Sequence, residues 1–328
     1  MKRPTLQDVL AARQVVARYL PRTPLHRSIA LGRLLGADVF VKYENHHPVG
    51  AFKVRGGVYR LSRLTPEERR AGVVTASTGN HAQSVAYAAR LFGVGAQILM
   101  PDGSNPDKVA AVRDMGGEVI FHGRDFDEAR FHAEDIAREQ GAVFINSADE
   151  PDLIAGVGTM ALEILEDLPD PDLLIVPVGG GSSACGNAIV LKAVNPRIQV
   201  IGVQAEGAPA VCLSYRAGKI VETPEVATSA EGLATRVPFE LTFSILRDLL
   251  DDIVLVTDDE IDRAIVLLLR ATHNLAEGAG AAPLAAALKL RGRIAGKKIV
   301  LILSGGNLNV EKLKEILNNA GPELNKTL

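Results

Sequence analysis

The sequence predicts an α/β protein built on a largely parallel sheet. Short runs rich in β-branched and apolar residues alternate with longer helical patterns along the 328 residues, which is typical of βαβ units. Several of the short runs are continuously apolar, as expected for strands that helices cover on both faces. The length corresponds to about two domains.

Nine segments are predicted as strands: 39–43, 73–76, 97–100, 118–121, 143–145, 173–178, 200–203, 253–256 and 299–303. Helices are predicted between them. The first covers 6–20 and is capped by Thr5, and another covers 107–115 and ends at Gly116. The longest helical pattern covers 258–276.

The composition excludes several classes of protein. The chain is 47% hydrophobic, with 31 glycines and 17 prolines, so collagen-like and disordered chains are excluded. Its 36 basic and 39 acidic residues form no basic stripe, so no nucleic acid is expected as a partner. Cys185 and Cys212 are too few for a disulfide framework, and no Cys/His spacing is typical of a zinc site.

The sequence gives no sign of export or membrane insertion. Charged residues interrupt the N-terminal segment, which lacks the apolar core of a signal peptide. No uncharged apolar run reaches the roughly 18 residues that a membrane span needs. We therefore expect a cytoplasmic protein that does not associate with membranes.

Four polar or glycine-rich loops follow predicted strands: 44–55, 77–81, 179–186 and 304–307. Ligands of open parallel sheets bind outside the carboxyl ends of the strands, so these loops are the candidate site. Taken singly, each has an ordinary structural explanation. Lys53 could be a solvated lysine, Ser304 a turn residue, and 77–81 a simple helix cap.

The glycine-rich loop at 179–186 predicts a phosphate site, because a strand precedes it and a helix follows. It does not match the common nucleotide motifs. A P-loop needs Lys followed by Ser or Thr after Gly186, where this chain has Asn187, and the dinucleotide pattern fails at Ala184. A tight turn that only brings helix and strand together explains this loop equally well.

Four motifs together resemble the fold-type II pyridoxal-phosphate (PLP) enzymes of the serine/threonine dehydratase and serine racemase group. VKYENHHPVGAFKVRGG resembles the Schiff-base segment of that group, STGNHAQSVAYAA its asparagine loop, VPVGGGSSACG its phosphate loop, and LSGGN its pyridine-nitrogen segment. The motifs occur in the family's order, from about Thr23 to Asn307. The resemblance is therefore specific.

The resemblance implies a fold and a domain division. The fold is that of the tryptophan synthase β-like enzymes, with two doubly wound open-sheet domains and the cofactor between them. Residues 1–65 and 150–328 are expected to form a large PLP-binding domain. Residues 66–149 are expected to form a small domain that carries the substrate loop, and the group usually forms homodimers.

The resemblance also implies roles for individual residues. Lys53 would hold the cofactor through a Schiff base and then act as the base. The other cofactor-binding residues would be Phe52 and Asn80, the phosphate-binding Gly179, Gly180, Gly181 and Ser182, and Ser304 at the pyridine nitrogen. The substrate carboxylate would be bound by Ser77, Thr78, Gly79 and His81, and Thr78 stands where racemases carry a catalytic serine.

The implied reaction is the conversion of L-threonine or L-serine to a 2-oxo acid and ammonia. A hydroxyl at the pyridine nitrogen leaves that nitrogen largely unprotonated, which favours elimination over transamination. The alternatives are a serine racemase and a dehydratase for phenylserine or 3-hydroxyaspartate. A non-catalytic binding protein of the same fold is a further alternative, although it would be expected to have lost Lys53.

The resemblance also raises the possibility of a magnesium or calcium ion. Glu206 and Ala210 match two ligands of the metal-binding members, but Cys212 replaces the second carboxylate. Hard cations prefer oxygen ligands, so this replacement weakens the predicted site. Glu206 and Ala210 are the predicted metal ligands.

Overall fold

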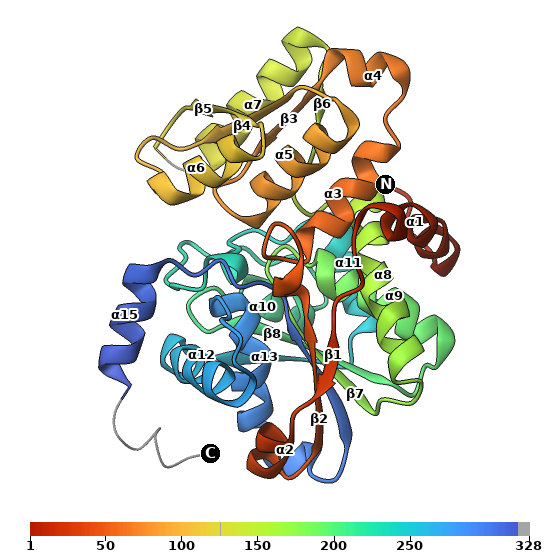
Figure 1. The fold of residues 1–328 in the computed structure, drawn as a ribbon, viewed down its shortest axis with the longest axis vertical. Coiled ribbons are helices and arrows are strands. Elements are labelled where there is room, and N and C mark those ends of the chain that lie inside the picture. Colours follow the sequence, from red (N-terminus) through yellow and green to blue (C-terminus); the bar gives the residue numbers. More distant parts are fainter. Residues whose placement is uncertain (125, 321–328) are drawn as a thin grey trace. The chain divides into compact units, whose positions relative to one another are not determined.

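The computed structural model describes residues 1–124 and 126–320. The last part of the predicted large domain, 321–328, lies outside the described residues. By packing, the chain divides into two compact units, each built on its own sheet (Figure 1). The smaller unit comprises Met1–Pro21 and Lys53–Thr159, and the larger unit comprises Arg22–Phe52 and Met160–Leu328.

The smaller unit has a fully parallel four-stranded sheet in the order β5-β4-β3-β6. Its strands are β3 (Val73–Ala76), β4 (Ala96–Met100), β5 (Glu118–Phe121) and β6 (Val143–Phe144). Its helices are α1 (Leu6–Tyr19), α3 (Lys53–Ser62), α4 (Pro66–Ala71), α5 (Asn80–Phe92), α6 (Pro106–Asp114), α7 (Phe126–Gln140) and the first part of α8 (Pro151–Asp167). Alanines of α7 pack on Val74 and Leu99, so this helix lies close to the sheet.

The larger unit has a six-stranded sheet in the order β1-β2-β10-β7-β8-β9. Only the edge strand β1 is antiparallel to its neighbour. The strands are β1 (Leu25–Arg27), β2 (Asp38–Tyr43), β7 (Leu173–Pro177), β8 (Gln199–Ala205), β9 (Asp252–Val256) and β10 (Lys298–Leu303).

Helices and two 3-10 turns lie between or after these strands. They are α2 (Ile29–Leu35), η1 (Glu44–His46), α9 (Ser182–Val194), α10 (Ala210–Ala217), η2 (Glu231–Leu233), α11 (Glu240–Leu249), α12 (Asp258–Thr272), α13 (Gly278–Lys289), α14 (Arg291–Ile294) and α15 (Val310–Asn319). No helix among the described residues is long and apolar enough to cross a membrane.

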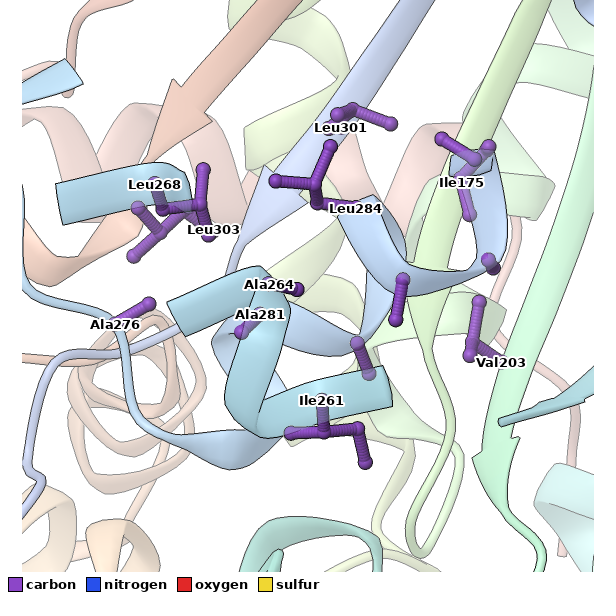
Figure 2. Close-up of a cluster of buried hydrophobic side chains, with 14 of the residues drawn as sticks. Ile175, Val203, Ile261, Ala264, Leu268, Ala276, Ala281, Leu284, Leu301 and Leu303 are labelled. Carbon is purple, nitrogen blue, oxygen red and sulfur yellow. The ribbon is translucent and has the colours of Figure 1, made fainter. Parts of the chain in front are cut away.

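The main core of the larger unit lies between one face of its sheet and α12 and α13. Figure 2 shows Ile175 and Leu301 of the sheet beside Leu284 of α13. Alternate side chains of a strand point to opposite faces, and Leu174 and Val300 are also fully buried. Helices therefore cover both faces, which confirms the predicted doubly wound fold.

All nine predicted strands are present, with small shifts at their ends. The short strand β1 was not predicted. The prediction of a helix over 258–276 was wrong at its end, because α12 stops at Thr272 and His273 takes the left-handed conformation with φ 58°. The longest described helix is α8, with 17 residues.

The two packing units group the chain differently from the predicted domains. Helix α3 packs on α5, and α1 packs on α3. By these contacts, the N-terminal helix and residues 53–62 group with the four-stranded sheet. The domain boundaries near 65 and 150 stay a prediction.

Candidate active site

Lys53 is the first residue of α3, in the smaller unit. Its Nζ donates a hydrogen bond to the backbone oxygen of Ser147 at 2.8 Å. Burial removes water from the ammonium group and lowers the pKa of Lys53 from 10.5 to about 8. A larger fraction of this amine is therefore neutral near physiological pH, as attack on an aldehyde requires.

The backbone of Lys53 is also fixed, through a residue that the sequence analysis did not single out. The Ser84 hydroxyl of α5 donates to the Lys53 carbonyl oxygen at 2.7 Å. The two helices approach so closely that a side chain at Gly57 would place its Cβ 2.3 Å from the Ser84 Oγ. Ser84 thus ties Lys53 to the helix that begins at Asn80.

The predicted substrate loop connects β3 to α5. Ser77 N donates to the Leu99 carbonyl oxygen at 3.1 Å, and Gly79 N donates to the Ser77 Oγ at 3.2 Å. Gly79 caps α5 without a side-chain hydrogen bond, and a Cβ at this position would meet no atom within 4 Å. The first-turn amides of α5, from Asn80 onward, have no acceptor within the helix, and such a helix start suits a carboxylate.

His81 is buried in the first turn of α5. The Thr75 hydroxyl donates to the Ile145 carbonyl oxygen at 2.8 Å and lies 3.0 Å from His81 Nε2. Since the Thr75 proton is used, His81 must donate from Nε2 and carry its lone pair on Nδ1. Burial, and next the charge of Lys53, lower the pKa of His81 to about 3, so the ring stays neutral.

In the larger unit, the segment that leads to Lys53 is bound to the loop after β10. Phe52 N donates to the Ser304 carbonyl oxygen at 2.9 Å, and Gly306 N donates to the Gly50 carbonyl oxygen at 2.9 Å. The Asn307 side chain donates to the Val49 carbonyl oxygen at 2.8 Å. Two motifs about 250 residues apart in sequence are thereby joined.

Ser304 directly follows β10 and is 1% exposed. The described residues show no hydrogen bond of its hydroxyl, while its backbone oxygen accepts from Phe52. The side chain of Ser304 can therefore donate to or accept from a ligand.

The glycine-rich loop joins β7 to α9. Gly181 caps α9 with φ 98°, a conformation that suits glycine, and a Cβ at Gly179 would lie 2.1 Å from the Gly232 carbonyl oxygen. Ser182 is the first residue of α9. The first-turn amides have no acceptor within the helix, so this loop can bind an anion through its backbone.

The predicted metal ligands have competing contacts. The Glu206 carboxylate lies 3.4 Å from Lys289 Nζ, which also lies 3.3 Å from Glu260 and donates to the Leu255 carbonyl oxygen. Cys212, in the third ligand position, is buried. No group of three or more His, Cys, Asp or Glu side chains among the described residues could hold a metal ion.

The ammonium group of Lys289 competes with a divalent cation for the Glu206 carboxylate. Glu206 and Ala210, the first residue of α10, stay predictions as metal ligands.

Comparison with known proteins gives the class. A family model described as pyridoxal-phosphate dependent enzyme matches residues 16–305. The chain is 41% identical over 314 residues to the L-threonine ammonia-lyase of Thermotoga maritima, covering 96% of this chain and 78% of that relative. It is 40% identical to the catabolic L-threonine dehydratase of Escherichia coli K12, covering 95% of each chain.

Solved structures of related enzymes resemble this chain over nearly its whole length. The threonine deaminase isoform 2 of Solanum lycopersicum superposes with a TM-score of 0.92 at 37% identity, over 96% of this chain and 92% of that chain. Maize serine racemase superposes with a TM-score of 0.92 at 34% identity, over 97% and 98% of the two chains.

The chain therefore belongs to the pyridoxal-phosphate dependent enzymes. Within them it falls in the fold-type II group of serine/threonine dehydratases and serine racemases, which confirms the predicted family and fold. Pyridoxal 5'-phosphate is its cofactor. The residues present fit this group, since Lys53 offers an amine of lowered pKa and the loop at Gly179–Ser182 offers an anion cradle.

Proposed function

We propose that the protein is an ammonia-lyase that converts L-threonine, L-serine or a related 3-hydroxy amino acid to a 2-oxo acid and ammonia. The observation that carries this proposal is the 40% identity to a catabolic L-threonine dehydratase over 95% of both chains. With both chains aligned almost end to end, the likeness extends well beyond the cofactor motifs.

Lys53 is proposed both to hold the cofactor and to act as the base. When bound, the cofactor supplies an electron sink for the bond electrons of the substrate α-carbon. Lys53 would hold the cofactor through its Nζ and would also accept the substrate α-proton on that atom. The lowered pKa of Lys53 keeps that nitrogen ready to accept a proton near neutral pH.

Binding and orientation are assigned to the remaining residues. The amides of Gly179, Gly180, Gly181 and Ser182 hold the phosphate, with Phe52 at the ring, Asn80 at the 3-hydroxyl and Ser304 at the pyridine nitrogen. Ser77, Thr78, Gly79 and His81 belong to the loop that receives the substrate carboxylate. His81 is itself buried, so it acts by holding the start of α5 in place.

Loss of the β-hydroxyl, with a proton, completes the elimination. The released enamine hydrolyses to a 2-oxo acid and ammonia. We also propose that the enzyme is a homodimer in the cytoplasm, as is expected from the group.

Serine racemase is the second candidate, favoured by the TM-score of 0.92 to the maize enzyme. A panel of L-threonine, L-serine, phenylserine and 3-hydroxyaspartate separates the candidates when 2-oxo acid and the opposite enantiomer are measured in the same reaction. We expect 2-oxo acid to form fastest from L-threonine or L-serine. If no 2-oxo acid formed from any of the four, the enzyme would not be a lyase of this class.

A further inference from the structure

Ser183 carries a buried hydroxyl without a partner. It is the second residue of α9, directly after the phosphate loop, and is 3% exposed. Its Oγ makes no hydrogen bond with any described residue. A buried hydroxyl left unpaired is costly, and native structures normally satisfy such groups with protein, water or ligand.

The position of Ser183 in the helix indicates where its side chain is directed. The Cα–Cβ bonds of an α-helix tilt towards its N-terminus, so a residue in the first turn projects towards the preceding loop. One turn further on, the Asn187 side chain donates to the Ser183 carbonyl oxygen at 2.8 Å. Asn187 Oδ1 is, like the Ser183 hydroxyl, buried without a partner among the described residues. From the tilt of the Cα–Cβ bond we infer that the Ser183 hydroxyl is directed to the Gly179–Ser182 loop.

The hydroxyl also makes none of the usual local bonds. A serine inside a helix often donates to a backbone oxygen three or four residues earlier, as Ser214 does to Ala210 at 2.7 Å. Ser183 does not. The N-terminus of α9, where an anion is favoured, can supply the partner that this hydroxyl lacks.

We propose that the Ser183 hydroxyl donates a hydrogen bond to the cofactor phosphate, in addition to the backbone amides of the loop. This inference rests on the proposed position of the phosphate at Gly179–Ser182. A hydrogen bond to a phosphate oxygen is charge-assisted and stronger than a neutral one. Ser183 accordingly helps the protein to select the phosphorylated cofactor over the same ring without phosphate.

The test compares the binding of PLP and pyridoxal, which differ in the phosphate, to the cofactor-free protein by absorbance titration. Ser183→Ala should weaken PLP binding about 10- to 100-fold, while pyridoxal binding should change less than about twofold. Ser214→Ala is the matched control, because Ser214 is equally buried but its hydroxyl bonds only to protein. The control should leave the ratio of the two affinities unchanged.

A second readout is independent of affinity. The ³¹P resonance of bound PLP should shift in Ser183→Ala, because a donor to the phosphate is lost. Thermal unfolding of the cofactor-free variant establishes that it folds, and Ser183→Cys, which is close in size and a weaker donor, should bind PLP with intermediate affinity.

Unchanged PLP binding in Ser183→Ala would overturn the inference. An equal loss of affinity for PLP and pyridoxal would overturn it as well. In either case the hydroxyl would not bind the phosphate, and an internal water beside Asn187 would satisfy it instead. A Gly181→Ala variant shows whether only the role of Ser183 is wrong or whether the loop at Gly179–Ser182 is not the phosphate site. If Gly181→Ala selectively loses PLP and Ser183→Ala does not, the loop still binds the phosphate and only the role of Ser183 is wrong. If the wild type binds PLP no more tightly than pyridoxal, the loop itself is not the phosphate site.

Discussion

The candidate residues of the two units differ in their chemistry. In the smaller unit two of them are titratable and have lowered pKa values, about 8 for Lys53 and about 3 for His81. In the larger unit they are backbone amides and hydroxyls, at the start of α9 and at Ser304. We therefore propose that proton transfer depends on Lys53 in the smaller unit, and that the candidate groups of the larger unit bind as neutral donors.

The largest effect is expected when the titratable amine of Lys53 is removed. Lys53→Ala should abolish the visible absorbance of the lysine-bound cofactor and lower turnover by about 10³-fold or more, because both the attachment point and the base are lost. Turnover and absorbance are measured together, with thermal unfolding to establish that the variant folds. Lys219→Ala, at an exposed lysine, is the control and should be fully active. Substantial turnover by Lys53→Ala would show that another lysine is the base.

The lowered pKa of Lys53 can be tested by the rate at which the cofactor-free protein captures PLP. Only the neutral amine attacks the aldehyde, so the rate should rise with pH, be half-maximal near pH 8 and level off above it. A free lysine, with a pKa near 10.4, should level off about two pH units higher. Near neutral pH, the difference corresponds to roughly 10²-fold more neutral amine.

Stopped-flow absorbance over pH 6–11 measures this rate, with N-acetyl-lysine as the matched amine. His81 should add no second step between pH 6 and 7, because its pKa of about 3 keeps it neutral there. A protein profile that coincides with that of the free amine would refute the effect of burial on Lys53.

A charged side chain introduced in the larger unit tests the role proposed for its neutral groups. Ser304→Asp places a carboxylate at the proposed pyridine-nitrogen position, and an opposite charge raises the pKa of such a nitrogen by about 1–3 units. We expect abortive transamination to increase several-fold relative to elimination, with a smaller change in cofactor affinity. The measurement is the ratio of pyridoxamine phosphate to 2-oxo acid. Ser304→Ala, which stays neutral, should keep the wild-type ratio, and an unchanged ratio in Ser304→Asp would show that Ser304 does not face the nitrogen.

The smallest expected effect concerns Thr78. Its β-methyl restricts the rotamer of its hydroxyl, so protonation of the α-carbon from the face opposite Lys53 should be slow. We predict that the wild type deaminates L-serine much faster than it racemises it, and that Thr78→Ser raises racemisation a few-fold. D-serine and pyruvate are measured side by side for both proteins. Faster racemisation than deamination by the wild type would contradict the assignment.

The sequence predicted the parallel strands because long apolar runs are visible without tertiary information, as at β7 and β10. It did not predict β1, since Leu25–Arg27 is short, partly exposed and formed by pairing with β2. It also missed the end of α12, because His273 takes a left-handed conformation that few non-glycine residues adopt.

The candidate site was predicted from the resemblance of four motifs. Within each motif, the resemblance implies a role only for certain individual residues. Ser84 and Ser183 were missed for this reason, since both stand inside these motifs but the resemblance implies a role for neither. Their roles depend on tertiary contacts, namely a close crossing of α3 and α5 for Ser84 and a buried unpaired hydroxyl for Ser183. The serine pair after three glycines, at 182–183, was the available signal for Ser183.

The role of Lys53 is tested most directly by locating the residue to which the cofactor is covalently attached. Borohydride reduction of the PLP-loaded enzyme, followed by digestion and mass spectrometry, should find the reduced cofactor on Lys53 alone, and saturating L-serine added before reduction should diminish that label. A label on another lysine, or one on Lys53 that substrate does not displace, would contradict the role of Lys53 as both attachment point and base.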